Sequence, residues 1–194
     1  MGAAAFLLMA LSDLLKVRGL RRAPLLFSAG GALLALATVF LIAERGFGLP
    51  AAQPWRFAFL LPGIAALGLL AYTVCFAVPG GAPEEDGLLP LTDDGVYALC
   101  RHPGVLWLSA FYLSLWGFLG GNALCAAWLL FTGLDICYVF WQDRKIFPKT
   151  IQGYRAYRQR TPFLLPGPAE IRLCFRQLRA RFWNMREGQK GSRL

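Results

Sequence analysis

The sequence predicts an all-α integral membrane protein, a helical bundle of about five transmembrane helices followed by a cytoplasmic C-terminal helical extension. Of its 194 residues, 57% are hydrophobic and only 16% are charged, and the mean hydropathy is +0.48. Soluble domains usually carry about 25% charged residues. The composition therefore excludes an ordinary soluble globule, and its high hydrophobicity also excludes intrinsic disorder.

Runs of uncharged residues define the expected spans. Residues 24–43 carry no charge, and at 1.5 Å per residue they are long enough to cross a hydrocarbon core of about 30 Å. Residues 55–78 give the next span, in which Pro62 is expected to kink the helix. Residues 2–15 are apolar but short. They lack the basic leading region of a signal peptide, so we expect them to form a first, short span.

The last apolar stretch, residues 104–141, contains a single charge, Asp135. It divides at Gly120-Gly121-Asn122, a turn sequence, and so predicts a helical hairpin with spans at 104–119 and 123–141. An ionisable residue inside a span is a functional hypothesis by default. For Asp135 the alternative is a structural hydrogen bond to another span, and for Asp13 a simple pair with Lys16 is expected.

Basic residues are concentrated at one expected side of the membrane. The net charge is +9, and 13 of the 20 Lys and Arg residues follow Trp141. By the positive-inside rule, the first loop, the 79–103 loop and the tail are cytoplasmic. Five spans put the N-terminus outside and four put it inside, without moving the other loops. We therefore divide the chain into a transmembrane bundle, 1–141, and a cytoplasmic basic extension, 142–194.

The extension is expected to lie on the membrane. Residues 169–186 have helical periodicity and predict an amphipathic interfacial helix, with arginines beside and opposite an apolar line. Beside long apolar runs, an anionic cytoplasmic leaflet is a better partner for these charges than nucleic acid. The five cysteines form no CxxC pair and the chain has one histidine, so we expect no metal site. The oligomeric state cannot be inferred.

Two segments could carry chemistry. In the first, Tyr97, Arg101 and His102 precede Pro103, which suits the first turn of the next helix. These residues form either a charged interfacial anchor or an anion or cofactor site at a helix N-terminus. The second segment begins at Gln142 and Asp143 and continues to a helical face with Tyr154, Tyr157 and Arg158. Taken alone, that face is typical of a basic helix on lipid headgroups.

Together these segments resemble the isoprenylcysteine carboxyl methyltransferase and phospholipid N-methyltransferase superfamily. The likeness covers residues 95–166 and consists of G-x-Y-x-x-x-R-H-P, two spans, then Y-x-x-Y-x-x-x-x-P-x-x-x-P. Gln142-Asp143 stands where that family has a Glu-Glu pair. The resemblance implies an integral membrane enzyme that transfers a methyl group from S-adenosylmethionine, bound at the cytoplasmic helix ends, to a lipophilic or small membrane-partitioned acceptor. The acceptor could be a carboxylate, an amine or a thiol.

The resemblance also implies roles for individual residues. Asp143 and Arg158 would be catalytic. The cofactor would be bound by Tyr97, Arg101, His102, Pro103, Gln142, Asp143, Tyr154 and Tyr157. Arg101 could pair with the carboxylate of S-adenosylmethionine, Asp143 could accept from its ammonium or ribose hydroxyls, and an aromatic wall could contact the sulfonium. If the acceptor needs a base, Asp143 and His102 are the candidates.

Three positions depart from the family pattern. Val105 replaces an aromatic residue, Trp107 replaces a glycine and Gln142 replaces the first Glu. Trp107 could fill space needed by a cofactor or lipid. The alternative function is therefore a catalytically lapsed family member that acts as a membrane scaffold or lipid-binding subunit. A membrane reductase related to this superfamily is disfavoured by the small size of the chain.

Overall fold

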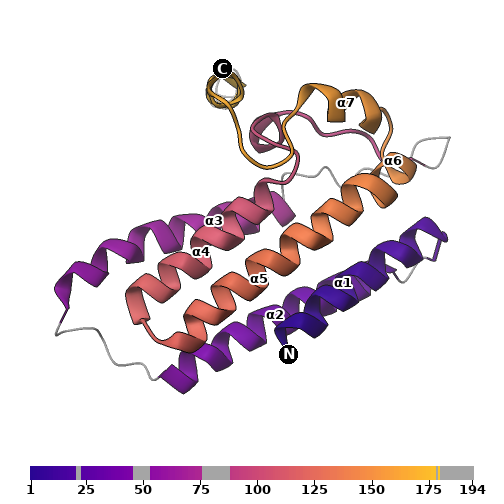
Figure 1. Cartoon of the computed structure of the whole chain (residues 1–194). Helices are drawn as coiled ribbons and strands as arrows, with labels where there is room; N and C mark the ends of the chain where they lie inside the picture. The colour runs from indigo at the N-terminus through magenta and orange to yellow at the C-terminus, as the bar shows by residue number, and fades with distance from the viewer. Residues whose placement is uncertain (21–22, 46–52, 76–87, 178, 180–194) are drawn as a thin grey trace, which may run out of the picture.

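A computed structural model describes residues 1–20, 23–45, 53–75, 88–177 and 179. Over these residues the protein is all-α, without strands (Figure 1). Its labelled helices are α1 (Gly2–Val17), α2 (Ala23–Arg45), α3 (Leu60–Cys75), α4 (Pro103–Leu119), α5 (Asn122–Trp141), α6 (Phe147–Thr150) and α7 (Tyr154–Arg160). Residues 168–177 are also helical, whereas residue 178 and residues 180–186 of the interfacial helix predicted at 169–186 lie outside the described part.

Three helical segments are long and apolar enough to cross a membrane: Ala23–Arg45, Pro54–Cys75 and Asn122–Thr150. The second combines a 3₁₀ turn, Pro54–Phe59, with α3, and Pro62 lies in the first turn of α3, where its missing N–H costs little. Residues 76–78 of the predicted span lie outside the described part. Helix α4 is shorter, with 17 residues, and α1 has 16. The multi-pass membrane architecture is thus supported, and the full number of five spans stays a prediction.

The helices form two antiparallel hairpins joined through α5. Helix α1 packs on α2, α3 packs on α4, and α5 lies against both α4 and α1. The chain runs back and forth, so the end of α1, the start of α4 and the end of α5 meet at the end of the bundle that carries α6 and α7 (Figure 1). The sequence predicted this grouping. Which side of a membrane this end faces stays a prediction.

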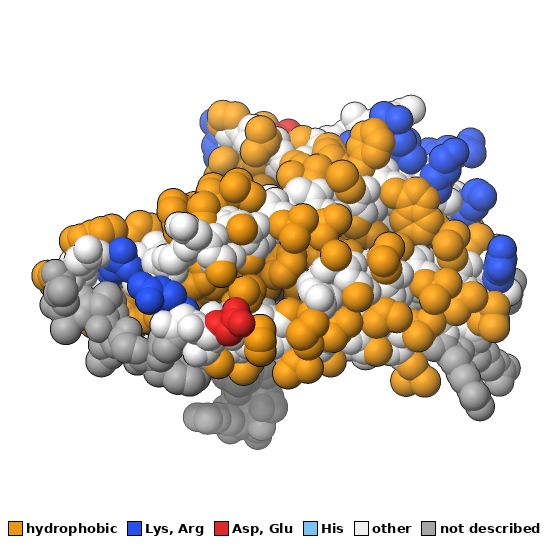
Figure 2. Space-filling view, turned by 60° about the horizontal axis from the view of Figure 1, so that its bottom comes forward, with side chains coloured by type: hydrophobic (Ala, Val, Ile, Leu, Met, Phe, Trp, Pro, Cys, Tyr) orange, Lys and Arg blue, Asp and Glu red, His pale blue; other side chains and the backbone are white. Residues whose placement is uncertain are grey.

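Aromatic and aliphatic side chains fill the centre of the bundle. The core cluster consists of Phe6, Leu108, Tyr112, Ala127 and Phe131. Other large apolar side chains point outward: Leu25, Leu61 and Leu129 are 68%, 76% and 60% exposed. Figure 2 shows hydrophobic side chains across the flank of the bundle, with basic side chains toward its ends. Because such a surface is unfavourable in water, it supports burial of these flanks in lipid.

Candidate functional site

The carboxylate of Asp143 is the centre of a polar cluster at the end of α5. Asp143 is only 3% exposed. Tyr154 donates its hydroxyl hydrogen to Oδ1 over 2.7 Å, and Arg101 donates from Nη1 to the same oxygen. Nε of Arg158 lies 3.2 Å from Oδ2, and Nε2 of His102 lies 3.5 Å from Oδ1. The structure therefore brings together five of the predicted site residues, from three segments of the chain.

A π turn, Gln142–Ile146, sets the direction of Asp143. The wider turn follows α5 without a break and is often found at functional sites. Pro103 occupies the first turn of α4 and places Arg101 and His102 just before it. Gly153 has φ +66°, a left-handed conformation that suits glycine, and it starts α7 so that Tyr154 faces the cluster.

The segment after α7 covers the cluster. The backbone N–H of Arg101 donates to the carbonyl of Pro162 over 2.9 Å. The ring of Phe163 lies 5.3 Å from the Arg101 guanidinium and 5.0 Å from the His102 ring, and Phe147 stacks on His102 at 5.8 Å. The basic extension is therefore docked on the bundle at this point and does not project freely from it.

Two of the predicted tyrosines hold the framework together. Tyr157, which is 2% exposed, donates its hydroxyl hydrogen to the carbonyl of Tyr97 over 2.7 Å. Tyr97 in turn donates to the carbonyl of Thr73 over 3.3 Å. Burial raises the pKa of Tyr97 to about 12, so its hydroxyl stays protonated at neutral pH. Burial, followed by the hydrogen bond to Asp143, also raises the pKa of Tyr154 well above its usual value.

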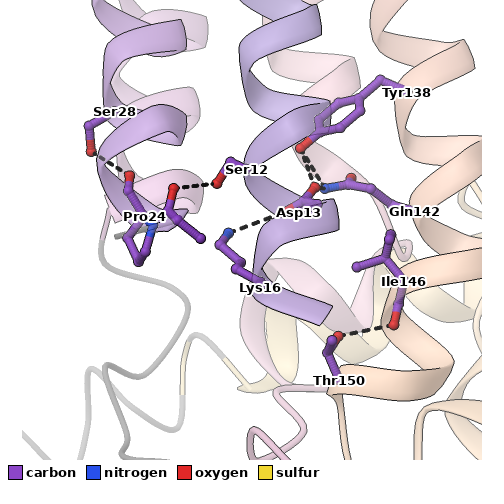
Figure 3. Close-up of polar contacts among 10 residues, drawn as sticks. Ser12, Asp13, Lys16, Pro24, Ser28, Tyr138, Gln142, Ile146 and Thr150 are labelled. Carbon is purple, nitrogen blue, oxygen red and sulfur yellow. Dashed lines mark hydrogen bonds and ion pairs between the residues drawn. The ribbon is translucent and has the colours of Figure 1, made fainter. Parts of the chain in front are cut away.

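Gln142 has partners that the sequence did not predict (Figure 3). Its Nε2 donates to Oδ2 of Asp13 over 2.6 Å and lies 2.8 Å from the Tyr138 hydroxyl, which also donates to Asp13. The expected pair of Asp13 with Lys16 is confirmed at 3.1 Å. Gln142 and Asp143 thus belong to two separate clusters, one that ties α1 to α5 and one that ties α7 to α4.

A cavity of about 600 Å³ lies between the two hairpins and α5. Its walls are mostly apolar, and five predicted site residues line it: Tyr97, Arg101, His102, Pro103 and Gln142. Asp143, Tyr154, Tyr157 and Arg158 are not among the lining residues. Of the positions that depart from the family pattern, Val105 lines the cavity and Trp107 does not. The concern that Trp107 fills this space is therefore not supported.

Within the described residues, no group of three or more His, Cys, Asp or Glu residues could hold a metal ion, and the five cysteines are free.

The guanidinium of Arg101 has only part of its hydrogen-bonding capacity satisfied. Its Nε is buried without a hydrogen-bond partner, although its Nη1 pairs with Asp143. A buried donor without a partner is costly, and this one belongs to a residue that lines the cavity.

Comparisons of this chain with protein-family models, with curated proteins and with solved structures found no match.

His102, the single histidine in the chain, should make stability depend on pH. Burial lowers the pKa of His102, and contact with the Asp143 carboxylate opposes that shift. Because the unfolded chain then binds a proton more readily than the folded protein, stability falls as pH falls through the unfolded value near 6.5. Unfolding free energies measured from pH 7 to pH 5 should decline less in His102→Gln than in the wild type. Parallel profiles would contradict a buried neutral imidazole.

Proposed function

We propose that this protein transfers a methyl group from S-adenosylmethionine to a lipophilic or membrane-partitioned acceptor. The observation that carries the proposal is the position of Arg101 and His102. Both contact Asp143 and both line the cavity of about 600 Å³, so the polar cluster meets a mostly apolar chamber there. Chambers of about 300–1,000 Å³ with a few polar groups are typical small-molecule sites.

The residues present fit such a cofactor. The free Nε of Arg101 could donate to the carboxylate of S-adenosylmethionine. His102, whose pKa is lowered by burial, is neutral at physiological pH and could accept a proton if the acceptor is an amine or thiol. The cofactor supplies the activated methyl group. The chain's contribution is to align the acceptor and exclude water, which can account for several kcal/mol of the barrier.

One observation favours the alternative, a lapsed member that serves as a scaffold or lipid-binding subunit. Both oxygens of Asp143 already have partners, Arg101, His102 and Tyr154 at Oδ1 and Arg158 at Oδ2. In this function the cluster is a structural clamp between α7 and the bundle. For methyl transfer, cofactor binding must instead break the ion pair between Arg101 and Asp143, so that one of these side chains can contact the cofactor.

Cofactor binding separates the two functions. Isothermal titration calorimetry with S-adenosylmethionine and the detergent-purified protein should show saturable binding. A dissociation constant near the micromolar range corresponds to a binding free energy of about −8 kcal/mol. Arg101→Ala should weaken binding by about 10-fold, the effect of one lost charge-assisted hydrogen bond. The matched control is Arg160→Ala, which removes only an exposed pair with Asp93 and should bind like the wild type. A folded wild type that binds no S-adenosylmethionine would leave the lapsed member as the function.

A further inference from the structure

Asp135 is a carboxylate in the wall of the cavity. It lies on α5 together with Tyr138 and Val139, and these residues line the cavity with Gln142 of the π turn that follows. Asp135 comes eight residues before Asp143, which places it about 12 Å farther along the bundle at 1.5 Å per residue. It is therefore remote from the Asp143 cluster, and the proposed methyl transfer assigns it no role.

The two buried carboxylates in the described part of the bundle are neutralised by the chain itself, whereas Asp135 is half-buried at the cavity wall. Asp13 has Lys16 at 3.1 Å and accepts hydrogen bonds from Tyr138 and Gln142. Asp143 forms ion pairs with two arginines and accepts a hydrogen bond from a tyrosine. For Asp135, by contrast, no hydrogen bond or ion pair is found within the described residues.

An isolated carboxylate in an apolar interior is strongly unfavourable, and intramembrane acids usually pair with a cation. Arg101 is the cation that shares the cavity wall, and it is already paired with Asp143. A ligand that carries a positive charge could therefore give Asp135 the partner that the described residues do not supply.

The rest of the cavity suits a hydrocarbon chain. Its walls carry apolar side chains from α2, α3 and α4, among them Phe27, Leu34, Leu67, Leu70, Leu108 and Phe111. Since α2 packs on α1 and α3 packs on α4, the cavity lies between hairpins whose outer faces are apolar. An amphiphile with one alkyl chain and one compact cationic head matches this combination.

We propose that the cavity binds a single-chain lipophilic amine, with its ammonium group paired to Asp135 and its alkyl chain along α2, α3 and α4. The amine would share the cavity with the proposed methyl transfer, but its binding does not depend on that reaction, because the carboxylate it needs, Asp135, lies apart from the cluster at Asp143. The ion pair forms away from bulk water, where a charge-assisted hydrogen bond is strong. A neutral alcohol of the same chain length would fill the same space without neutralising the carboxylate.

Equilibrium binding of radiolabelled dodecylamine to the purified full-length protein tests the proposal. The wild type should bind it saturably, and Asp135→Asn, which keeps the shape and removes the charge, should weaken binding by about 10-fold or more. Asp93→Asn is the matched control, since Asp93 lies on the surface in a pair with Arg160, and it should leave binding unchanged. Thermal unfolding of each variant checks that the fold is retained.

A second variant tests the chamber separately from the charge. Gly31 lines the cavity, and a Cβ added there would meet no atom within 4 Å. Gly31→Leu should therefore extend into the alkyl-chain space and reduce dodecylamine binding while Asp135 is intact. Equal affinity of the wild type and Asp135→Asn would overturn the proposal. So would displacement of dodecylamine by dodecanol at equal concentration, because that result would mean recognition of the chain without the ammonium.

Discussion

Replacement of Asp143 by alanine is expected to lower the free energy of unfolding by about 3–5 kcal/mol, the usual effect of removing one partner from a buried ion pair. The reason is that Arg101, with a side chain only 10% exposed, would keep its charge without a partner. Tyr154 and Arg158 would at the same time lose the group that attaches α7 to the bundle. Unfolding in mixed micelles with increasing sodium dodecyl sulfate measures the loss.

Limited proteolysis gives a second readout of the same change. Arg155, Arg158 and Arg160 lie on α7, so trypsin should cleave there faster in Asp143→Ala than in the wild type. Asp93→Ala is the matched control because it breaks an exposed ion pair to the same helix, at Arg160. Exposed pairs contribute about 0–1 kcal/mol. If both variants lost the same stability, the Asp143 cluster would not be the clamp that holds α7.

The fold was largely predictable because the signal for a membrane helix is local. Residues 24–43 have no charge, and the matching helix α2 extends over Ala23–Arg45. The Gly120-Gly121 turn was equally clear, and both glycines have positive φ. The number of spans does not follow from sequence in the same way, since α1 is only 16 residues long and contains Asp13. Length alone does not decide whether such a helix crosses a bilayer.

The site was predictable only in part. The resemblance grouped Arg101, Asp143 and Tyr154, and these side chains do meet. It also treated Gln142 and Asp143 as a pair, whereas the π turn directs them to different clusters. No residue pattern signals a π turn here. The partners of Asp13 were missed for another reason: Tyr138 and Gln142 are 125 and 129 positions away, and periodicity detects only local neighbours.

The cavity and its unpaired acid illustrate the same limit. Asp135 stood out in the sequence because it is ionisable and lies in an apolar span. Whether it had a partner depended on packing among four helices, which the sequence does not reveal. Trp107 was suspected of filling the pocket from its size alone. Whether Trp107 occupies the pocket depends on which face of α4 carries its side chain, and Trp107 is not part of the cavity lining.

Adjacent glycines on α2 should respond in opposite ways to the same substitution. A Cβ at Gly30 would lie 2.7 Å from the backbone oxygen of Ala5 and 2.8 Å from Cγ of Met9. Gly30→Leu must therefore separate α1 from α2, and we expect it to cost about 3 kcal/mol, the upper end for an overpacked contact. Since α1 carries Asp13, this variant should also disrupt the hydrogen bonds that reach Gln142.

At Gly31 the added side chain has open space. Leucine favours a helix over glycine by about 0.8 kcal/mol, so Gly31→Leu should leave the protein as stable as the wild type or slightly more stable. Unfolding of both variants in sodium dodecyl sulfate makes the comparison. Equal destabilisation would contradict the close α1–α2 contact, because helix propensity and added hydrophobicity are the same at both positions. The difference between the two variants therefore reports the close α1–α2 contact together with any gain from filling cavity space at Gly31.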